Sequence, residues 1–170
     1  MGSMNDDRQQ AAARALSSPL RLRVLRLCGF EARTNKELAE LLDVNPGTML
    51  HHVRTLVRTG FLAPEDERAG TKGAREVPYK ATGLSWRTPL PRGSRVLVEV
   101  FLQQLETVEP DDLKATWMGL RLNDEHKEEF KNRMYELLNE FKERGPDADG
   151  TPYSFFSALH PDQNPPAPEH

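Results

Sequence analysis

The stretch from Thr34 to Gly60 constrains the fold most, because it predicts two short helices joined by a tight turn. Thr34 followed by Glu37 is a capping box, in which a hydroxyl and a carboxylate satisfy backbone donors at the start of a helix. Asn45 followed by Pro46 starts a second helix, since asparagine caps well and proline at the first position has no donor to lose. Gly60 ends that helix.

The second helix is expected to have one apolar and one polar face. Offsets of three and four predict a packed side made of Met49, Val53, Leu56 and Val57. The opposite face gathers hydroxyls, an imidazole and two guanidiniums from Thr48, His51, Arg54, Thr55 and Arg58. Such groups hydrogen-bond to base edges in the major groove and pair with phosphates, which predicts a DNA-reading helix. The alternative is an ordinary helical hairpin with a solvated polar face.

A β-hairpin with a long tip is predicted after the second helix. The run FLAPE precedes a polar loop, and in the following EVPYKAT the residues Val77, Tyr79 and Ala81 recur at a strand period. Two glycines lie in the loop beside three basic residues, Arg68, Lys72 and Arg75. A basic tip of this kind is suited to contact phosphates or the minor groove.

Helix, turn, helix and hairpin together resemble the winged helix-turn-helix of the ArsR family of bacterial transcriptional regulators. The resemblance rests on the run ELAELLDVNPGTMLHHVRTLVRTGFL, the SSPLRLRVLRLC helix before it and the strand-forming PYKAT after the loop, which together cover residues 17 to 82. The MarR and PadR groups share much of this pattern. The resemblance implies a regulator, expected to be a repressor, that binds double-stranded DNA as a homodimer. Its two half-sites would lie about 34 to 36 Å apart in the simplest geometry.

The charge distribution agrees with a nucleic-acid partner for the first half of the chain. Residues 1–93 hold 15 Lys and Arg against 10 Asp and Glu, a net charge of +5, whereas residues 94–170 hold 8 against 16, a net charge of −8. The acidic half should point away from DNA. No apolar run approaches the roughly 20 residues of a transmembrane helix, and no signal-peptide layout is present, which predicts a cytoplasmic protein with no membrane partner.

Catalytic, metal and redox roles have little support in the sequence. Cys28, the single cysteine, lies among leucines, which favours a buried apolar role over a redox sensor, although Arg26 is near. His51 and His52 are adjacent on a helix and cannot chelate one metal together. Neither a Gly-x-Ser-x-Gly elbow nor a P-loop occurs. We therefore expect no enzyme activity, no metal and no cofactor.

The second half of the chain predicts one apolar helix and a strand-helix-strand unit. The run SRVLVEVFLQQLETVE is apolar around much of its circumference, so it is either the homodimer interface or a core helix of a second domain. Alternation over residues 113–122 predicts a strand, Asn123 to Gly145 predicts a long helix, and the aromatic run over residues 153–160 predicts another strand. If both strands share a sheet, they are expected to be parallel.

The expected fold class is therefore α+β, with an N-terminal winged helix-turn-helix followed by a C-terminal helix and a strand-helix-strand region for dimerisation and sensing. The expected divisions are a DNA-binding domain over 4–82, a linker over 83–93, a dimerisation and effector-sensing domain over 94–160 and a disordered tail over 161–170. Met1 to Ser3 are typical of an expression tag.

A candidate effector pocket and a competing function complete the expectations. The pocket would combine aromatic and basic side chains from Trp86, Phe101, Trp117, Arg121 and Tyr153. The alternative is that these residues pack a second core, as aromatic residues more often do. The competing function is a winged-helix protein-interaction module that does not bind DNA directly.

Overall fold

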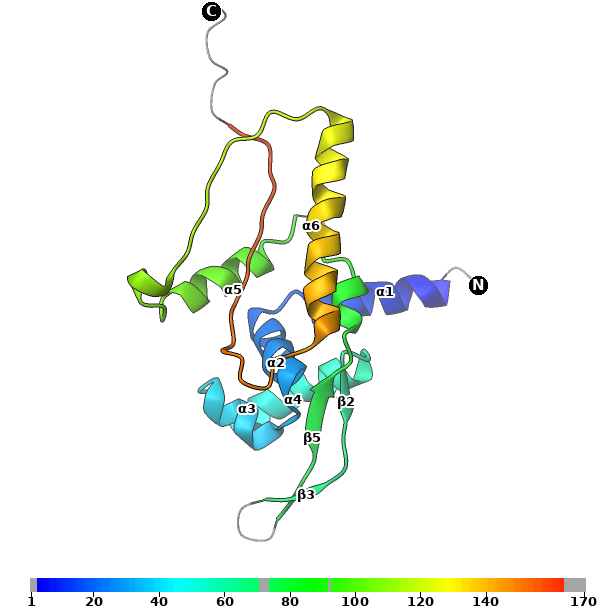
Figure 1. Cartoon of the computed structure of the whole chain (residues 1–170). Coiled ribbons are helices and arrows are strands. Elements are labelled where there is room, and N and C mark those ends of the chain that lie inside the picture. The colour runs from blue at the N-terminus through cyan, green and yellow to red at the C-terminus, as the bar shows by residue number, and fades with distance from the viewer. Residues whose placement is uncertain (1–2, 71–73, 92, 164–170) are drawn as a thin grey trace, which may run out of the picture. The chain divides into compact units, whose positions relative to one another are not determined.

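The computed structural model describes residues 3–70, 74–91 and 93–163 (Figure 1). The chain divides into two compact units, Met1–Thr107 and Val108–His170, and each is described by itself. The α+β class is confirmed, whereas the domain boundaries predicted at residues 82 and 93 stay a prediction. Much of the tail predicted to be disordered, residues 164–170, lies outside the described residues. No helix in the described part of the chain is long and apolar enough to cross a membrane.

Five α-helices and one 3-10 helix are described in the first unit. Their bounds are α1 (Ser3–Ala15), α2 (Pro19–Phe30), α3 (Asn35–Leu41), α4 (Pro46–Arg58), η2 (Leu84–Arg87) and α5 (Val96–Leu105). The predicted capping box of α3 is confirmed, since Glu37 N donates to Thr34 Oγ1 at 3.2 Å and Thr34 N donates to Glu37 Oε2 at 2.7 Å. Gly60 has a φ of +79°, and the backbone N–H groups of Gly60 and Phe61 donate to Val57 and Leu56 at the end of α4.

The predicted hairpin is confirmed and joins a three-stranded antiparallel sheet of order β1-β5-β2. Its strands are β1 (Arg33–Thr34), β2 (Leu62–Pro64) and β5 (Pro78–Ala81), with Leu62 opposite Ala81 and Thr34 opposite Pro78. Toward the tip, β3 (Arg68–Ala69) and β4 (Arg75–Glu76) form a second short ladder. Figure 1 shows this wing extending beyond the helices of the unit. The two-residue β1 was not predicted.

The core of the first unit lies between α2, α3, α4 and the start of the sheet. Its most deeply buried apolar side chains, each at most 1% exposed, include Leu16, Val24, Cys28, Leu38, Met49, Val53, Leu56 and Phe61. Burial raises the pKa of Cys28 to about 11. Reactive thiols have lowered pKa values, so the structure agrees with the apolar role predicted for this residue.

Helix α5 has one packed side and one uncovered side. Val96 and Val100 are buried, α5 contacts α2, and Arg26 Nη1 donates to Gln104 Oε1 at 3.1 Å. Leu97, Val98 and Leu102 are instead exposed in the single chain. The helix is therefore packed within the first unit and keeps an apolar face that another surface is able to cover.

The second unit contains η3 (Pro110–Asp112) and the long helix α6 (Asp124–Arg144). The predicted cap is confirmed, because Asn123 Oδ1 accepts from His126 N at 2.8 Å. Gly145, with a φ of +71°, ends the helix as predicted. The Arg144 guanidinium lies 4.5 Å from the centre of the Phe141 ring.

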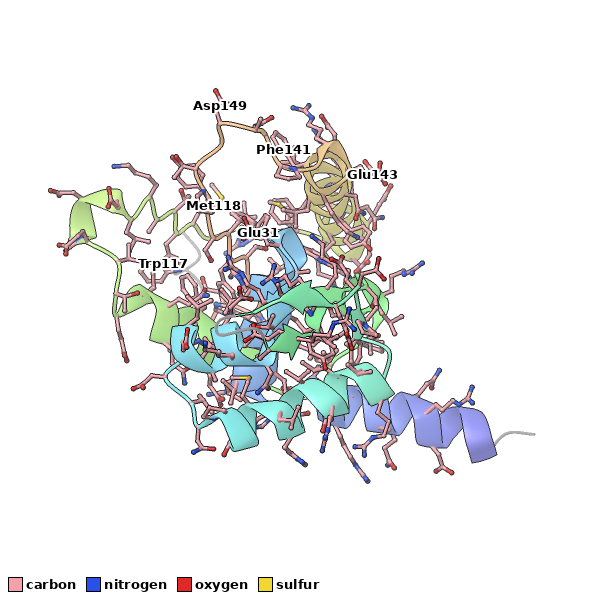
Figure 2. The ribbon with its side chains drawn as sticks, turned by 90° about the horizontal axis from the view of Figure 1, so that it is seen from below. Glu31, Trp117, Met118, Phe141, Glu143 and Asp149 are labelled. Carbon is pink, nitrogen blue, oxygen red and sulfur yellow. The ribbon has the colours of Figure 1, made fainter. Side chains whose placement is uncertain are left out.

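The two strands predicted in the second unit are wrong. Residues 113–122 and 153–160 are described but form no strand, so the parallel crossover is also absent from the described residues. Figure 2 shows Trp117 and Met118 on the extended segment before α6. The alternation over residues 113–122 is real, but a strand also needs a neighbouring strand to pair with, and the described residues form no strand pairing with either segment. Trp117 and Tyr153 are consequently 93% and 85% exposed.

Candidate nucleic-acid interface

The turn between α3 and α4 fixes how α4 is presented. Asp43 adopts a φ of +51°, a left-handed conformation that aspartate tolerates better than most residues. The next N–H, from Val44, donates back to Ala39 O at 2.9 Å and closes the end of α3. At the start of α4, Asn45 Oδ1 accepts from Gly47 N at 2.9 Å, as the predicted cap requires. The two helices are thereby held in a fixed relation.

The two predicted faces of α4 are both present in the structure. Met49, Val53 and Leu56 are fully buried against the rest of the unit. The opposite face exposes Thr48, His51, Arg54 and Arg58, while Thr55 is half-buried and donates to His51 O at 2.9 Å. No acidic residue occurs in α4. The exposed face therefore offers donors and positive charge without a competing carboxylate on the same helix.

The predicted wing cations are less available than those of α4. Arg68 Nη2 lies 2.5 Å from Glu37 Oε1, and Arg75 Nε lies 3.4 Å from Glu67 Oε2. Lys72 lies outside the described residues. Residues 65–76 hold four carboxylates and three basic side chains, so the wing has no net positive charge. The electrostatic attraction for phosphate should therefore come mainly from α4.

Glu37 connects the wing to the first helix of the pair. Its carboxylate accepts from the Thr34 backbone N–H and pairs with Arg68. Burial alone would raise the pKa of Glu37, but the bond from the Thr34 backbone and the charge of Arg68 outweigh it, so the pKa is lowered. The capping role was evident from the sequence. The contact with Arg68, 31 positions away, had no sequence signal.

His52 lies beside the residues of the exposed polar face of α4 but on a packed side of this helix. Its ring is half-buried, and its Nδ1 has no hydrogen-bond partner among the described residues. Burial lowers the pKa of His52, and the positive charges of Arg21 and His51 lower it further. The neutral ring is therefore the form that fits the folded unit.

The candidate effector residues are divided between the two units. Trp86, 57% exposed, and Phe101 belong to the first unit, and Trp117, Arg121 and Tyr153 belong to the second. Within the second unit the side chains of Trp117, Arg121 and Tyr153 are exposed. An effector pocket made from these residues stays a prediction.

Residues 16–65 match a protein-family model described as a helix-turn-helix domain. This segment contains α2, the predicted helix pair and the first strand of the wing, so the chain contains a helix-turn-helix domain as predicted. No curated protein matches the chain.

Several solved structures are similar to the chain, at a low level. An ArsR-like transcriptional regulator from Rhodococcus sp. RHA1 is 19% identical, with a TM-score of 0.42 over 62% of this chain and 88% of that chain. The homodimeric winged helix-turn-helix DNA-binding domain of Mb0332 from Mycobacterium bovis, described as a possible ArsR-family regulator, is 19% identical, with a TM-score of 0.42 over 69% and 93%. MepR, a transcription regulator of a Staphylococcus aureus multidrug efflux pump, is 14% identical, with a TM-score of 0.35 over 82% and 93%.

Proposed function

We propose that this chain, which contains a helix-turn-helix domain, is a sequence-specific transcriptional regulator that acts as a homodimer on an inverted-repeat operator, most simply as a repressor. One observation carries the proposal: α4 buries one side completely and exposes Thr48, His51, Arg54 and Arg58 on the other. A helix of this kind places its polar side in the major groove while its apolar side anchors it to the domain.

Each exposed group has a role that its chemistry suggests. Thr48, His51 and Thr55 are proposed to face bases or the groove wall, and Arg54 and Arg58 to bind base edges or phosphates. In the wing, Arg68, Lys72 and Arg75 are proposed to contact phosphate or the minor groove. Arg68 and Arg75 would first have to leave Glu37 and Glu67, so their net contribution should be smaller than that of Arg54.

The homodimer would use the uncovered side of α5. Leu97, Val98 and Leu102 form an exposed apolar strip on a helix whose other side already packs on α2. Burying such a strip against its copy removes apolar surface from water on both chains, and a two-fold arrangement would pair the same strip with itself. The helix would then form the homodimer interface on one side while its other side packs on α2 within the first unit.

The function is tested by binding the full chain to a pool of random duplexes at two salt concentrations and sequencing the retained DNA. We expect an inverted repeat to be enriched, and to be lost in the variant that combines Thr48→Ala with Arg54→Ala. For the recovered operator, Arg54→Ala alone should cost about 1–3 kcal/mol, whereas Lys72→Ala should weaken all sequences alike. No DNA binding under any condition would contradict the proposal and favour the protein-interaction module or a required effector.

A further inference from the structure

A cleft of about 250 Å³ lies in the first unit between the ends of α1 and α4 and the start of α2. Its lining residues are Ala11, Arg14, Ala15, Arg21, Thr55, Arg58 and Thr59. Three of the seven are arginines, two are threonines and none is acidic. The cleft is smaller than the roughly 300–1,000 Å³ of sites for drug-sized ligands, so it suits a small group.

Two of the three guanidiniums are available to a ligand. Arg14 and Arg58 are exposed and form no ion pair or side-chain hydrogen bond within the part of the chain that the structure describes. The Arg21 guanidinium instead bonds to the end of α1, since its Nε donates to Ala15 O and its Nη2 donates to Arg14 O at 2.8 Å. Burial also lowers the pKa of Arg21, which an adjacent anion would oppose.

The carbonyl ends of α1 and α4 lie at the cleft, and the negative end of a helix dipole disfavours a bound anion. At the end of α1, the guanidinium of Arg21 already satisfies the last carbonyls. At the end of α4, the Thr59 hydroxyl donates to Thr55 O at 2.8 Å and the Thr59 N–H donates to the same oxygen at 3.1 Å. Arg14 and Arg58 lie in the last turns of α1 and α4, so the negative ends of these helices offset part of their charge. Neither guanidinium forms an ion pair within the described part of the chain, so both keep their hydrogen-bond donors for a ligand.

We propose that this cleft binds an oxyanion of the phosphate class, with Arg14 and Arg58 as its direct ligands and Arg21 as a positioning residue that holds the end of α1. Guanidinium groups recognise phosphate by paired, charge-assisted hydrogen bonds, and the Arg14 and Arg58 side chains line the same cleft. The anion has two possible sources: a phosphate of the DNA backbone flanking α4, or a free phosphorylated solute. Thr55 and Arg58 also belong to the proposed DNA-facing surface, so the first source rests on the proposed function.

The test compares the full chain with Arg14→Gln and with the matched variant Arg8→Gln, which removes an exposed arginine from the same helix outside the cleft. One arm titrates inorganic phosphate and pyrophosphate into the protein without DNA, by calorimetry at constant ionic strength. The other arm measures binding to a duplex of arbitrary sequence at several salt concentrations.

If the cleft binds a free anion, phosphate binding should be saturable. Arg14→Gln should weaken it about tenfold or more, because one charge-assisted hydrogen bond is lost, and Arg8→Gln should leave it unchanged. A backbone site predicts instead that Arg14→Gln lowers duplex affinity and reduces the salt slope by about one, with no effect of Arg8→Gln. Phosphate binding by a chain that fails to bind any duplex would retain the site and reject the proposed function. Equal behaviour of both variants in both arms would overturn the site.

Discussion

Two glycines of the first unit allow the same substitution to be compared in opposite backbone conformations. Gly60 follows α4 with a φ of +79°, and Gly29 lies near the end of α2 with no left-handed φ. Among the described residues, a Cβ added at Gly60 would meet only Leu84 Cδ2 at 3.7 Å, and one added at Gly29 would meet no atom within 4 Å. Space is therefore not limiting at either position, and the difference between the two alanine variants reports backbone conformation alone.

The magnitudes follow from this geometry. An alanine in the left-handed region destabilises the folded state by about 1–2 kcal/mol. Alanine also has less conformational freedom than glycine in the unfolded chain, and this offsets about 0.4–1 kcal/mol of that loss. We therefore expect Gly60→Ala to lower the free energy of unfolding by about 1 kcal/mol. Gly29→Ala should raise it by about 0.5 kcal/mol, because alanine is the better helix former. Gly60→Asn should cost less than Gly60→Ala despite its larger side chain, since asparagine adopts the left-handed region more readily.

The measurement is urea unfolding followed by far-ultraviolet circular dichroism, at one protein concentration because a dimer makes stability concentration-dependent. With a denaturant dependence of about 1–3 kcal/mol per molar urea, the midpoints of Gly60→Ala and Gly29→Ala should lie about 0.5–1.5 M apart. Equal midpoints, or a Gly60→Ala variant as stable as the wild type, would refute the assignment of Gly60 as the left-handed end of α4.

Three further predictions concern the cap, the titration and the interface. Thr34→Val should lower the free energy of unfolding by about 1 kcal/mol more than Thr34→Ser, because only valine loses the oxygen that accepts from the start of α3, and equal losses would contradict the capping role. Since the folded pKa of His52 is lowered, the unfolded chain binds its proton first, so stability should fall as the pH drops below 6.5. Unfolding measured across that pH range should show a smaller loss of stability for His52→Gln than for the wild type. An unchanged pH dependence of stability in the variant would contradict this role of His52. Leu102→Glu should raise the dissociation constant of the proposed homodimer at least tenfold in analytical ultracentrifugation, whereas Leu41→Glu, at a similarly exposed residue of α3, should not.

The parts of the fold that sequence predicted are those fixed by neighbouring residues. A cap and its partner lie three positions apart at Thr34 and Asn123, and a helix end needs only one glycine, as at Gly60 and Gly145. The stripe that buries Val53 and its neighbours also follows from helical periodicity within one element. Each of these was predicted correctly because no information from elsewhere in the chain was required.

The parts that sequence missed depend on residues that meet only in the folded chain. The two-residue β1 is too short to show a period and exists because β5 offers it hydrogen bonds. The pair of Glu37 with Arg68 reduces the positive charge that the loop sequence suggested for the wing.

The strand predicted over residues 113–122 failed for the converse reason, since alternation specifies two faces of a strand but not the neighbour that would bond to it. The same distinction applies to the surface proposed to face DNA. Periodicity identifies which side of α4 is polar. Only the folded chain shows that Arg54 is exposed with no ion pair among the described residues, whereas Arg68 pairs with Glu37. Arg54→Ala should for that reason weaken operator binding more than Arg68→Ala does.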